Sequence, residues 1–208
     1  MSRSSSPPPA DTERAAPASG KKGRARLPVL VVVVLATAFL GARFLSAAGA
    51  RAAAMRAEAC QAIGPQTMAA PLKPGMEAPD FELADKSGKK WSLRSFRGKP
   101  VLLNFWATWC APCVEEMPSL ENLKKRLGDD LQILTVSVDE EWSLIDKFFP
   151  RGTALPVLLD TSKEVPKRYG TEKYPETFLI DSQGRLQTLL HQVKWDGAEA
   201  ALCLENLH

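Results

Sequence analysis

The sequence predicts an α/β domain whose mixed central sheet carries helices on both faces, preceded by one transmembrane helix. From residue 98 onward, short apolar runs rich in Val, Ile and Leu alternate with segments of helical periodicity, which is typical of parallel strands joined by helices. Near the C-terminus two such runs are separated only by a tight turn, which predicts an antiparallel hairpin. Parallel and antiparallel neighbours together make the sheet mixed.

The charge of the 208-residue chain is unevenly distributed. Its net charge is +3, but residues 1–26 hold six basic and two acidic side chains, which leaves 21 basic and 22 acidic side chains in the rest. The folded part is therefore nearly neutral and lacks the basic surface expected of a nucleic-acid-binding protein. Residues 1–26 are rich in Ser, Pro and Ala without an apolar face, so we expect a disordered basic tail in the cytoplasm.

An uncharged apolar run of sixteen residues, 27–42, follows the tail and continues beyond Arg43 to Ala50. We interpret residues 27–48 as a membrane anchor, long enough to cross a hydrocarbon core of about 30 Å. The alternative is a signal peptide, since Ala48-Gly49-Ala50 fits a cleavage site. The basic cluster before the run predicts a cytoplasmic N-terminus and an extracytoplasmic domain.

After the anchor we expect a juxtamembrane linker, 49–72, which begins as a helix and fades into a Pro/Gly segment, and then the folded domain, 73–208. The domain begins with a hairpin in which FELAD and KKWSL flank a Ser87-Gly88 turn. GKPVLLNFWA, from Gly98, is a strand buried on both faces. The pattern becomes helical at Cys113 and stops near Gly128.

The later elements follow from the same criteria. Apolar runs bounded by turn residues predict strands, and the periodic segments between them predict helices. The expected strands are 131–139, 156–160, 176–181 and 185–192, and the expected helices are 143–149, 163–170 and 196–207.

Two cysteines stand two residues apart in FWATWCAPC, where the first buried strand ends. A c-type haem anchor needs His directly after Cys113, and Val114 stands there. Zinc needs four ligands, but the chain has only two histidines, both far along the sequence. A purely structural bridge would close too short a loop to stabilise much. A redox pair is the favoured interpretation.

The position of the pair explains that chemistry. Cys110 lies where a strand meets a helix, and free N–H groups with the positive helix end stabilise a thiolate there. Cys113 lies one turn further in, placed to attack a mixed disulfide. Pro112 suits the first helical turn, where no backbone N–H is needed.

FWATWCAPC, the lead-in PGMEAPDFELADKSGKKWSLRSFRGK and PETFLID together resemble the TlpA/ResA/DsbE-type membrane-anchored thiol-disulfide oxidoreductases of bacteria. The resemblance covers residues 73–207. It implies a thioredoxin-like fold with an N-terminal β-hairpin extending the sheet. It assigns the redox cysteines to Cys110 and Cys113, and the redox-active disulfide between them makes any other cofactor, or a metal, unnecessary.

The resemblance also assigns roles to neighbouring residues. The active-site tryptophan falls on Trp109 and the cis-proline on Pro175, with Tyr174 before it, and these three are expected to bind substrate. The active-site glutamate falls on Glu116. The sequence departs from the family pattern at two positions. Asn104 stands where thioredoxins have a buried Asp, so Glu116 is expected to act as the base instead. The bulky Tyr174 stands where many relatives have Thr.

The expected function is that of an extracytoplasmic reductase of oxidised protein substrates, in cytochrome c maturation or copper-protein assembly. The resemblance implies a transmembrane electron donor of the DsbD/CcdA type and a single-pass location in the cytoplasmic (inner) membrane. The alternative is a peroxiredoxin-like thiol peroxidase, which requires Thr three residues before its cysteine, where Cys110 has Ala107.

Two further cysteines, Cys60 and Cys203, flank the domain. In an oxidising compartment they are candidates for a structural disulfide that closes a long loop. The alternative is that Cys203 is a core thiol on the last helix.

Overall fold

The computed structural model describes residues 26–69 and 71–204, with side chains from residue 29 onward. Residues 1–25, to which the sequence assigns a disordered tail, lie outside the described residues, as do the last three residues of the expected final helix and the residue after it. Two compact units are distinguished, Met1–Ala48 and Gly49–His208.

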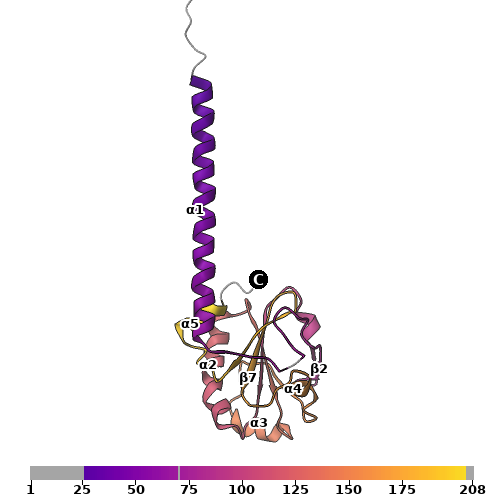
Figure 1. The fold of residues 1–208 in the computed structure, drawn as a ribbon. Coiled ribbons are helices and arrows are strands. Elements are labelled where there is room, and N and C mark those ends of the chain that lie inside the picture. Colours follow the sequence, from indigo (N-terminus) through magenta and orange to yellow (C-terminus); the bar gives the residue numbers. More distant parts are fainter. Residues whose placement is uncertain (1–25, 70, 205–208) are drawn as a thin grey trace, which may run out of the picture. The chain divides into compact units, whose positions relative to one another are not determined.

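The first described element is α1 (Arg26–Ala62), a single helix that runs through the predicted anchor (Figure 1). Its part Val29–Ala62 is long and apolar enough to cross a membrane, the one such helix among the described residues, and none of its most apolar stretch is buried. Length and composition therefore fit a membrane-spanning segment.

A six-stranded mixed sheet forms the second unit, as predicted, in the order β1-β8-β7-β4-β5-β6. β4 is parallel to β5, and β5 to β6, whereas β7 is antiparallel to β4 and to β8. The strands are β1 (Pro65–Gln66), β4 (Val101–Trp106), β5 (Gln132–Ser137), β6 (Val157–Leu159), β7 (Glu176–Ile180) and β8 (Leu186–His191).

β4 is central and buried along its whole length, as its apolar run predicts. Its side chains alternate between two cores, one on each face of the sheet. Leu102 and Trp106 join the core that contains α2 (Ala111–Leu127), α3 (Trp142–Phe148) and α5 (Ala198–Leu204). Leu103 and Phe105 join the other, with α4 (Glu164–Arg168) and the short 3₁₀ helix η1 (Leu93–Phe96).

The predicted N-terminal hairpin is present as β2 (Glu82–Ala84) and β3 (Lys90–Ser92), which pair antiparallel. It forms a sheet of its own rather than a continuous extension of the large one, to which one bridge, Asp85 to Leu158 on β6, connects it. Asp85 explains the sharp turn, because its carboxylate accepts hydrogen bonds from the N–H groups of Ser87 and Lys89.

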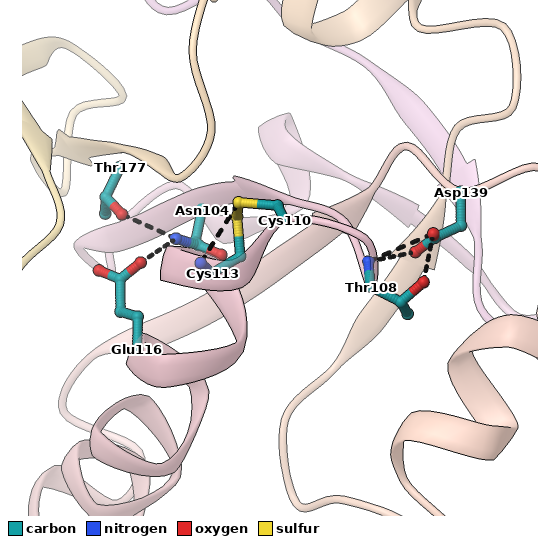
Figure 2. The surroundings of a disulfide bond; sticks show 7 residues. All are labelled: Asn104, Thr108, Cys110, Cys113, Glu116, Asp139 and Thr177. Carbon is teal, nitrogen blue, oxygen red and sulfur yellow. Dashed lines mark hydrogen bonds between the residues drawn. A yellow bond between two sulfur atoms is a disulfide. The ribbon is translucent and has the colours of Figure 1, made fainter.

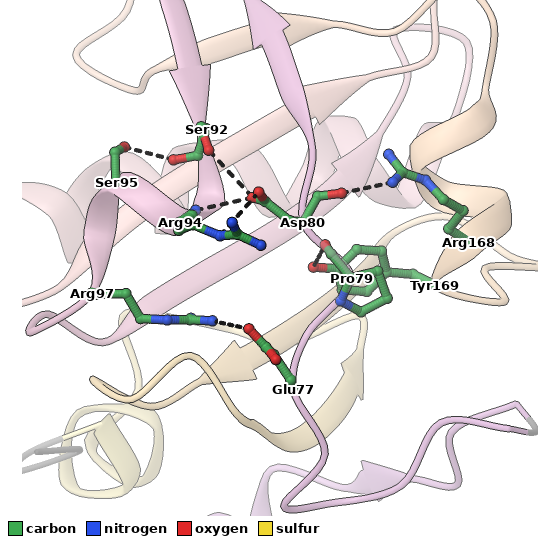
Figure 3. Close-up of polar contacts among 9 residues, drawn as sticks. All are labelled: Glu77, Pro79, Asp80, Ser92, Arg94, Ser95, Arg97, Arg168 and Tyr169. Atoms are coloured by element: carbon green, nitrogen blue, oxygen red, sulfur yellow. Dashed lines mark hydrogen bonds and ion pairs between the residues drawn. The ribbon is translucent and has the colours of Figure 1, made fainter.

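The lead-in before that hairpin is fixed onto α4 (Figure 3). The buried Tyr169 hydroxyl donates to the carbonyl of Pro79 at 2.8 Å, and Arg168 donates to the carbonyl of Asp80 at 2.6 Å. The Asp80 carboxylate in turn accepts from the N–H of Arg94 at the start of η1. The EAPDFEL segment therefore anchors the hairpin to the element that precedes the Tyr174-Pro175 loop.

In the segment 49–72 the expected helix is present, but the part after it differs from the predicted linker. The helix continues to Ala62, β1 pairs with β8 at the sheet edge, and Met68 and Leu72 are buried in a core. Much of the predicted linker is thus part of the folded unit. β1 has only two residues, one of them Pro, so it carries too little periodicity to be recognised from sequence.

Candidate functional site

The two cysteines of the CxxC sequence lie at the junction of β4 and α2 and form a disulfide with an S–S distance of 2.07 Å. Cys110 is the N-cap of α2, and its sulfur accepts the N–H of Cys113 at 3.3 Å. The helix begins at Ala111, slightly before the predicted start, because Pro112 suits its first turn. Gly128, with φ +55°, ends it as expected.

The two sulfur-bearing residues differ in exposure. Cys110 is 7% exposed and Cys113 is fully buried. Cys110 is more enclosed than a free helix end would suggest, but it remains the more accessible of the two. A partner molecule approaching the pair therefore meets Cys110 first.

The loop that precedes Cys110 is held by a carboxylate that the sequence analysis did not single out. Asp139, fully buried after β5, accepts the N–H of Thr108 at 3.1 Å and its hydroxyl at 2.7 Å. The hydroxyl of Ser137 donates to the same carboxylate at 2.6 Å. Figure 2 shows the contacts between Asp139 and Thr108 together with the disulfide. The only sequence signal was an acid directly after an apolar strand parallel to β4.

Glu116 lies one turn after Cys113 on the same helix and is buried. Its Oε1 accepts the indole N–H of the buried Trp195 at 2.5 Å and the N–H of Val193 at 3.3 Å. These hydrogen bonds favour the ionised carboxylate, but burial outweighs them and raises the pKa of Glu116 to about 7. Its neighbour Glu115 is exposed.

Asn104, in the middle of β4, connects Glu116 to the sheet. Its amide donates to Oε2 of Glu116 at 3.5 Å and to the hydroxyl of Thr177 at 2.9 Å (Figure 2). Asn104 is fully buried and cannot titrate, so Glu116 is the ionisable member of this hydrogen-bonded pair. Trp195 and Thr177 were missed because they come from distant segments whose approach only the fold reveals.

The loop before β7 contributes the aromatic part of the site. The Tyr174-Pro175 peptide bond is cis. The Tyr174 ring meets the ring of Trp109 edge to face, with centroids 5.8 Å apart, and Trp109 is 62% exposed. The structure therefore brings Trp109 and Tyr174 together beside Cys110, and an exposed indole is suited to contact a partner.

Cys60 and Cys203 lie apart from this site and form a second disulfide, with an S–S distance of 2.06 Å. It joins the C-terminal end of α1 to α5, and Cys203 is fully buried. None of the described cysteines is a free thiol.

A six-stranded mixed sheet with a CxxC disulfide at the start of a helix, facing a cis-proline loop, defines the thioredoxin-like class of redox proteins. A model of the AhpC/TSA family matches residues 74–189. The chain is 40% identical over 120 residues to the thiol-disulfide oxidoreductase ResA of Geobacillus thermodenitrificans, covering 56% of this chain and 68% of that protein. It is 38% identical over 122 residues to the thioredoxin-like protein YneN of Bacillus subtilis, covering 57% and 71%.

Solved structures agree on the fold. A candidate thiol:disulfide interchange protein DsbE from Chlorobium tepidum superposes with a TM-score of 0.60 at 28% identity, covering 66% of this chain and 99% of that chain. The exposed lipoprotein thioredoxin Etrx1 of Streptococcus pneumoniae gives 0.53 at 32% identity, covering 62% and 98%. The chain belongs to the AhpC/TSA family and, within it, to the ResA-like thiol-disulfide oxidoreductases. It is an oxidoreductase enzyme, and the peroxidase alternative is not favoured.

Proposed function

We propose that this enzyme reduces disulfide bonds of protein substrates outside the cytoplasm, with Cys110 as the attacking and Cys113 as the resolving thiol. The observation that carries the proposal is the unequal burial of the pair at the N-terminus of α2. The helix end favours a thiolate at Cys110, and the substrate reaches that sulfur first. Cys113 is one turn deeper and buried, so it can attack the sulfur of Cys110 but is not exposed to the substrate.

The exchange balances in two steps. The Cys110 thiolate attacks one substrate sulfur, forming a mixed disulfide and displacing the second substrate sulfur as a thiolate, which takes up a proton. Cys113 then loses its proton and attacks the sulfur of Cys110, which releases the first substrate sulfur. The substrate gains two electrons and two protons, and the enzyme ends with the Cys110–Cys113 disulfide.

Glu116 is proposed as the base that accepts the proton of Cys113. A carboxyl with a pKa of about 7 is divided between its two forms near neutral pH, so it can both take up and return a proton. Its hydrogen bonds with Trp195 and Val193 hold it in place. Since the disulfide itself is the redox group, the reaction needs no other cofactor.

Trp109, Tyr174 and Pro175 are proposed to bind the substrate strand. The exposed indole offers an aromatic face beside Cys110, and the backbone around Pro175 can pair with an extended segment. Peptide backbone is common to all substrates, so this contact supports action on many sequences.

The direction and the partners follow from the family resemblance. In an oxidising compartment a reductase must be reduced again after each turnover, so we propose a transmembrane electron donor of the DsbD/CcdA type. Suitable substrates are oxidised cysteine pairs of apocytochrome c or of copper-delivery proteins. The apolar part of α1 would anchor the enzyme in the cytoplasmic membrane, with the basic residues before it inside and the catalytic domain outside.

Insulin reduction beside peroxide consumption tests the proposed activity. The enzyme, supplied with dithiothreitol, should precipitate insulin chains faster than dithiothreitol alone, and both single Cys-to-Ser variants of the pair should lose this acceleration. Peroxide consumption should stay at the level of those variants. Rapid peroxide consumption without insulin reduction would contradict the proposal.

A further inference from the structure

A polar pocket that the exchange mechanism does not use lies behind the Tyr174-Pro175 loop. It is on the face of the sheet opposite α2. It has a volume of about 380 Å³ and is lined by residues of β1, β7, β8 and the loop before β7. Glu176, directly after Pro175, and His191 on β8 both line it. These two residues are opposite each other in the antiparallel register of β7 and β8, so their side chains share one face.

Glu176 is only 8% exposed, yet its Oε2 makes no hydrogen bond of good geometry with any described residue. The hydroxyl of Thr171 and the N–H groups of Lys173 and Glu172 are close enough to lower its pKa, but burial dominates and raises the pKa. A buried carboxylate oxygen without a partner is costly, because nothing replaces the water it lost on folding.

The imidazole of His191 also has a buried atom without a hydrogen-bond partner. Its Nε2 is buried and has no hydrogen-bond partner among the described residues. Burial, followed by the charge of Lys173, lowers the pKa of His191, so the ring is neutral at pH 7. The neutral ring carries one proton, so Nε2 accepts a hydrogen bond when that proton is on Nδ1 and donates one when it is on Nε2.

The Glu176 oxygen is an unpartnered acceptor at this pocket, and Nε2 of His191 is a second one when the ring proton is on Nδ1. Glu172 adds a second carboxylate to the lining. The group that satisfies both atoms must donate at least two hydrogen bonds and benefits from positive charge. An ammonium or a guanidinium fits, since both carry several donors and no acceptor. Lys173, the one lysine of the lining, forms no ion pair with these carboxylates among the described contacts.

We propose that this pocket, defined by Glu176 and His191, is a specificity site that binds a lysine or arginine side chain of the protein substrate. The proposal rests on the proposed function, because a substrate strand that pairs with the backbone at Pro175 passes directly beside Glu176. A basic residue close to the substrate cysteine then reaches the pocket while that cysteine is positioned at Cys110. The enzyme thereby prefers disulfides flanked by basic residues.

Paired peptides test this preference. Two disulfide-bonded peptides identical except for lysine or norleucine near the reactive cysteine are reduced by the enzyme, and kcat/KM is compared at low ionic strength. We expect about a tenfold preference for the lysine peptide, the size of one charge-assisted hydrogen bond. E176Q should lower that preference to near unity while the norleucine peptide is reduced as before.

H191Q provides a second variant should E176Q not fold, and it should weaken the same preference. D130N, which removes an exposed acid beyond the far end of α2, should leave it unchanged. Equal kcat/KM for the two peptides in the wild-type enzyme would overturn the inference, and an ordered water at the site would give that result. Failure to reduce either peptide would instead contradict the proposed function.

Discussion

At the scale of the residue, Glu116 is a buried carboxyl close to the redox pair whose pKa lies well above its ordinary value. Burial raises its pKa and the N–H donors of Trp195 and Val193 lower it, so its titration reports on the balance between the two. Asn104 beside it has no charge to add. The Glu116 carboxyl is therefore able to exchange a proton near neutral pH.

Replacing that carboxyl by an amide should change the pH dependence of reduction. E116Q should lose the dependence on a group with a pKa near 7 and turn over more slowly above that pH, since no base takes the proton of Cys113. E115Q, the change of an exposed neighbour, is the matched control and should keep the wild-type profile. The measurement is kcat for a peptide disulfide between pH 5 and 9, and overlapping profiles of E116Q and wild type would refute the role.

The ionisation of Glu116 should also make the stability of the folded protein depend on pH, in a direction that its pKa determines. The carboxyl of Glu116 has a pKa of about 7 in the folded protein against an ordinary value of 4.5, so between these values the folded state holds more protons than the unfolded state. Wild-type stability should therefore fall as pH rises through that window. The loss relative to E116Q should approach about 3 kcal/mol. Urea unfolding of both oxidised proteins at pH 5 and pH 8 measures it, and parallel changes would contradict the assignment.

Trp195 offers an independent test of what holds Glu116. W195F keeps an aromatic ring but removes the N–H that favours the carboxylate, so the pKa of Glu116 should rise further above 7. The pH profile of reduction should then shift to higher pH without loss of either thiol. A lowered pKa, followed by the pH dependence of the carboxyl signal in NMR, would mean that the indole does not stabilise the ionised form.

At the scale of the element, the last helix and the C-terminal end of α1 are joined by the Cys60–Cys203 disulfide, 143 residues apart in sequence. A bridge that closes so long a loop restricts the unfolded chain strongly. C60S/C203S should therefore unfold more easily than wild type by about 2–4 kcal/mol in urea. Insulin reduction at a temperature where both proteins are folded should be unchanged, because among the described contacts neither cysteine forms a hydrogen bond with the redox pair or with Glu116.

Thiol counting in the denatured, non-reduced wild-type protein is the direct check of this element. With the pair Cys110–Cys113 oxidised, no free thiol should react. Two reactive thiols would show that Cys60 and Cys203 are not bonded to each other. The predicted difference in stability would then have no basis.

At the scale of the whole molecule, the sequence predicted the elements that bury apolar residues on a regular period. β4, α2, β5 and the β7–β8 hairpin were anticipated because their patterns are set by burial in the sheet or against it. The cysteine pair was evident because its spacing, and Pro112 between the two cysteines, are recognisable in a short stretch of sequence at the end of a strand. The two-residue β1 and the separate sheet of the N-terminal hairpin were not anticipated, since both depend on tertiary pairing.

The missed residues of the site have a common cause. Three different segments contribute these residues, which are Asp139, Thr177 and Trp195. They lie near the CxxC region in the folded structure but far from it in sequence. A single acid after a strand or a single tryptophan in a loop has many ordinary explanations in a sequence. Their hydrogen bonds, rather than their spacing, identify them.

The central claim, that Cys110 attacks the substrate and Cys113 resolves the mixed disulfide, is tested most directly by trapping. C113S keeps the attacking thiol but lacks the resolving one, so it should accumulate covalent adducts with its substrates, visible as bands that disappear on reduction. C110S should accumulate few or none, since Cys113 is fully buried. Adducts that form on C110S and not on C113S would reverse the two roles and contradict the account.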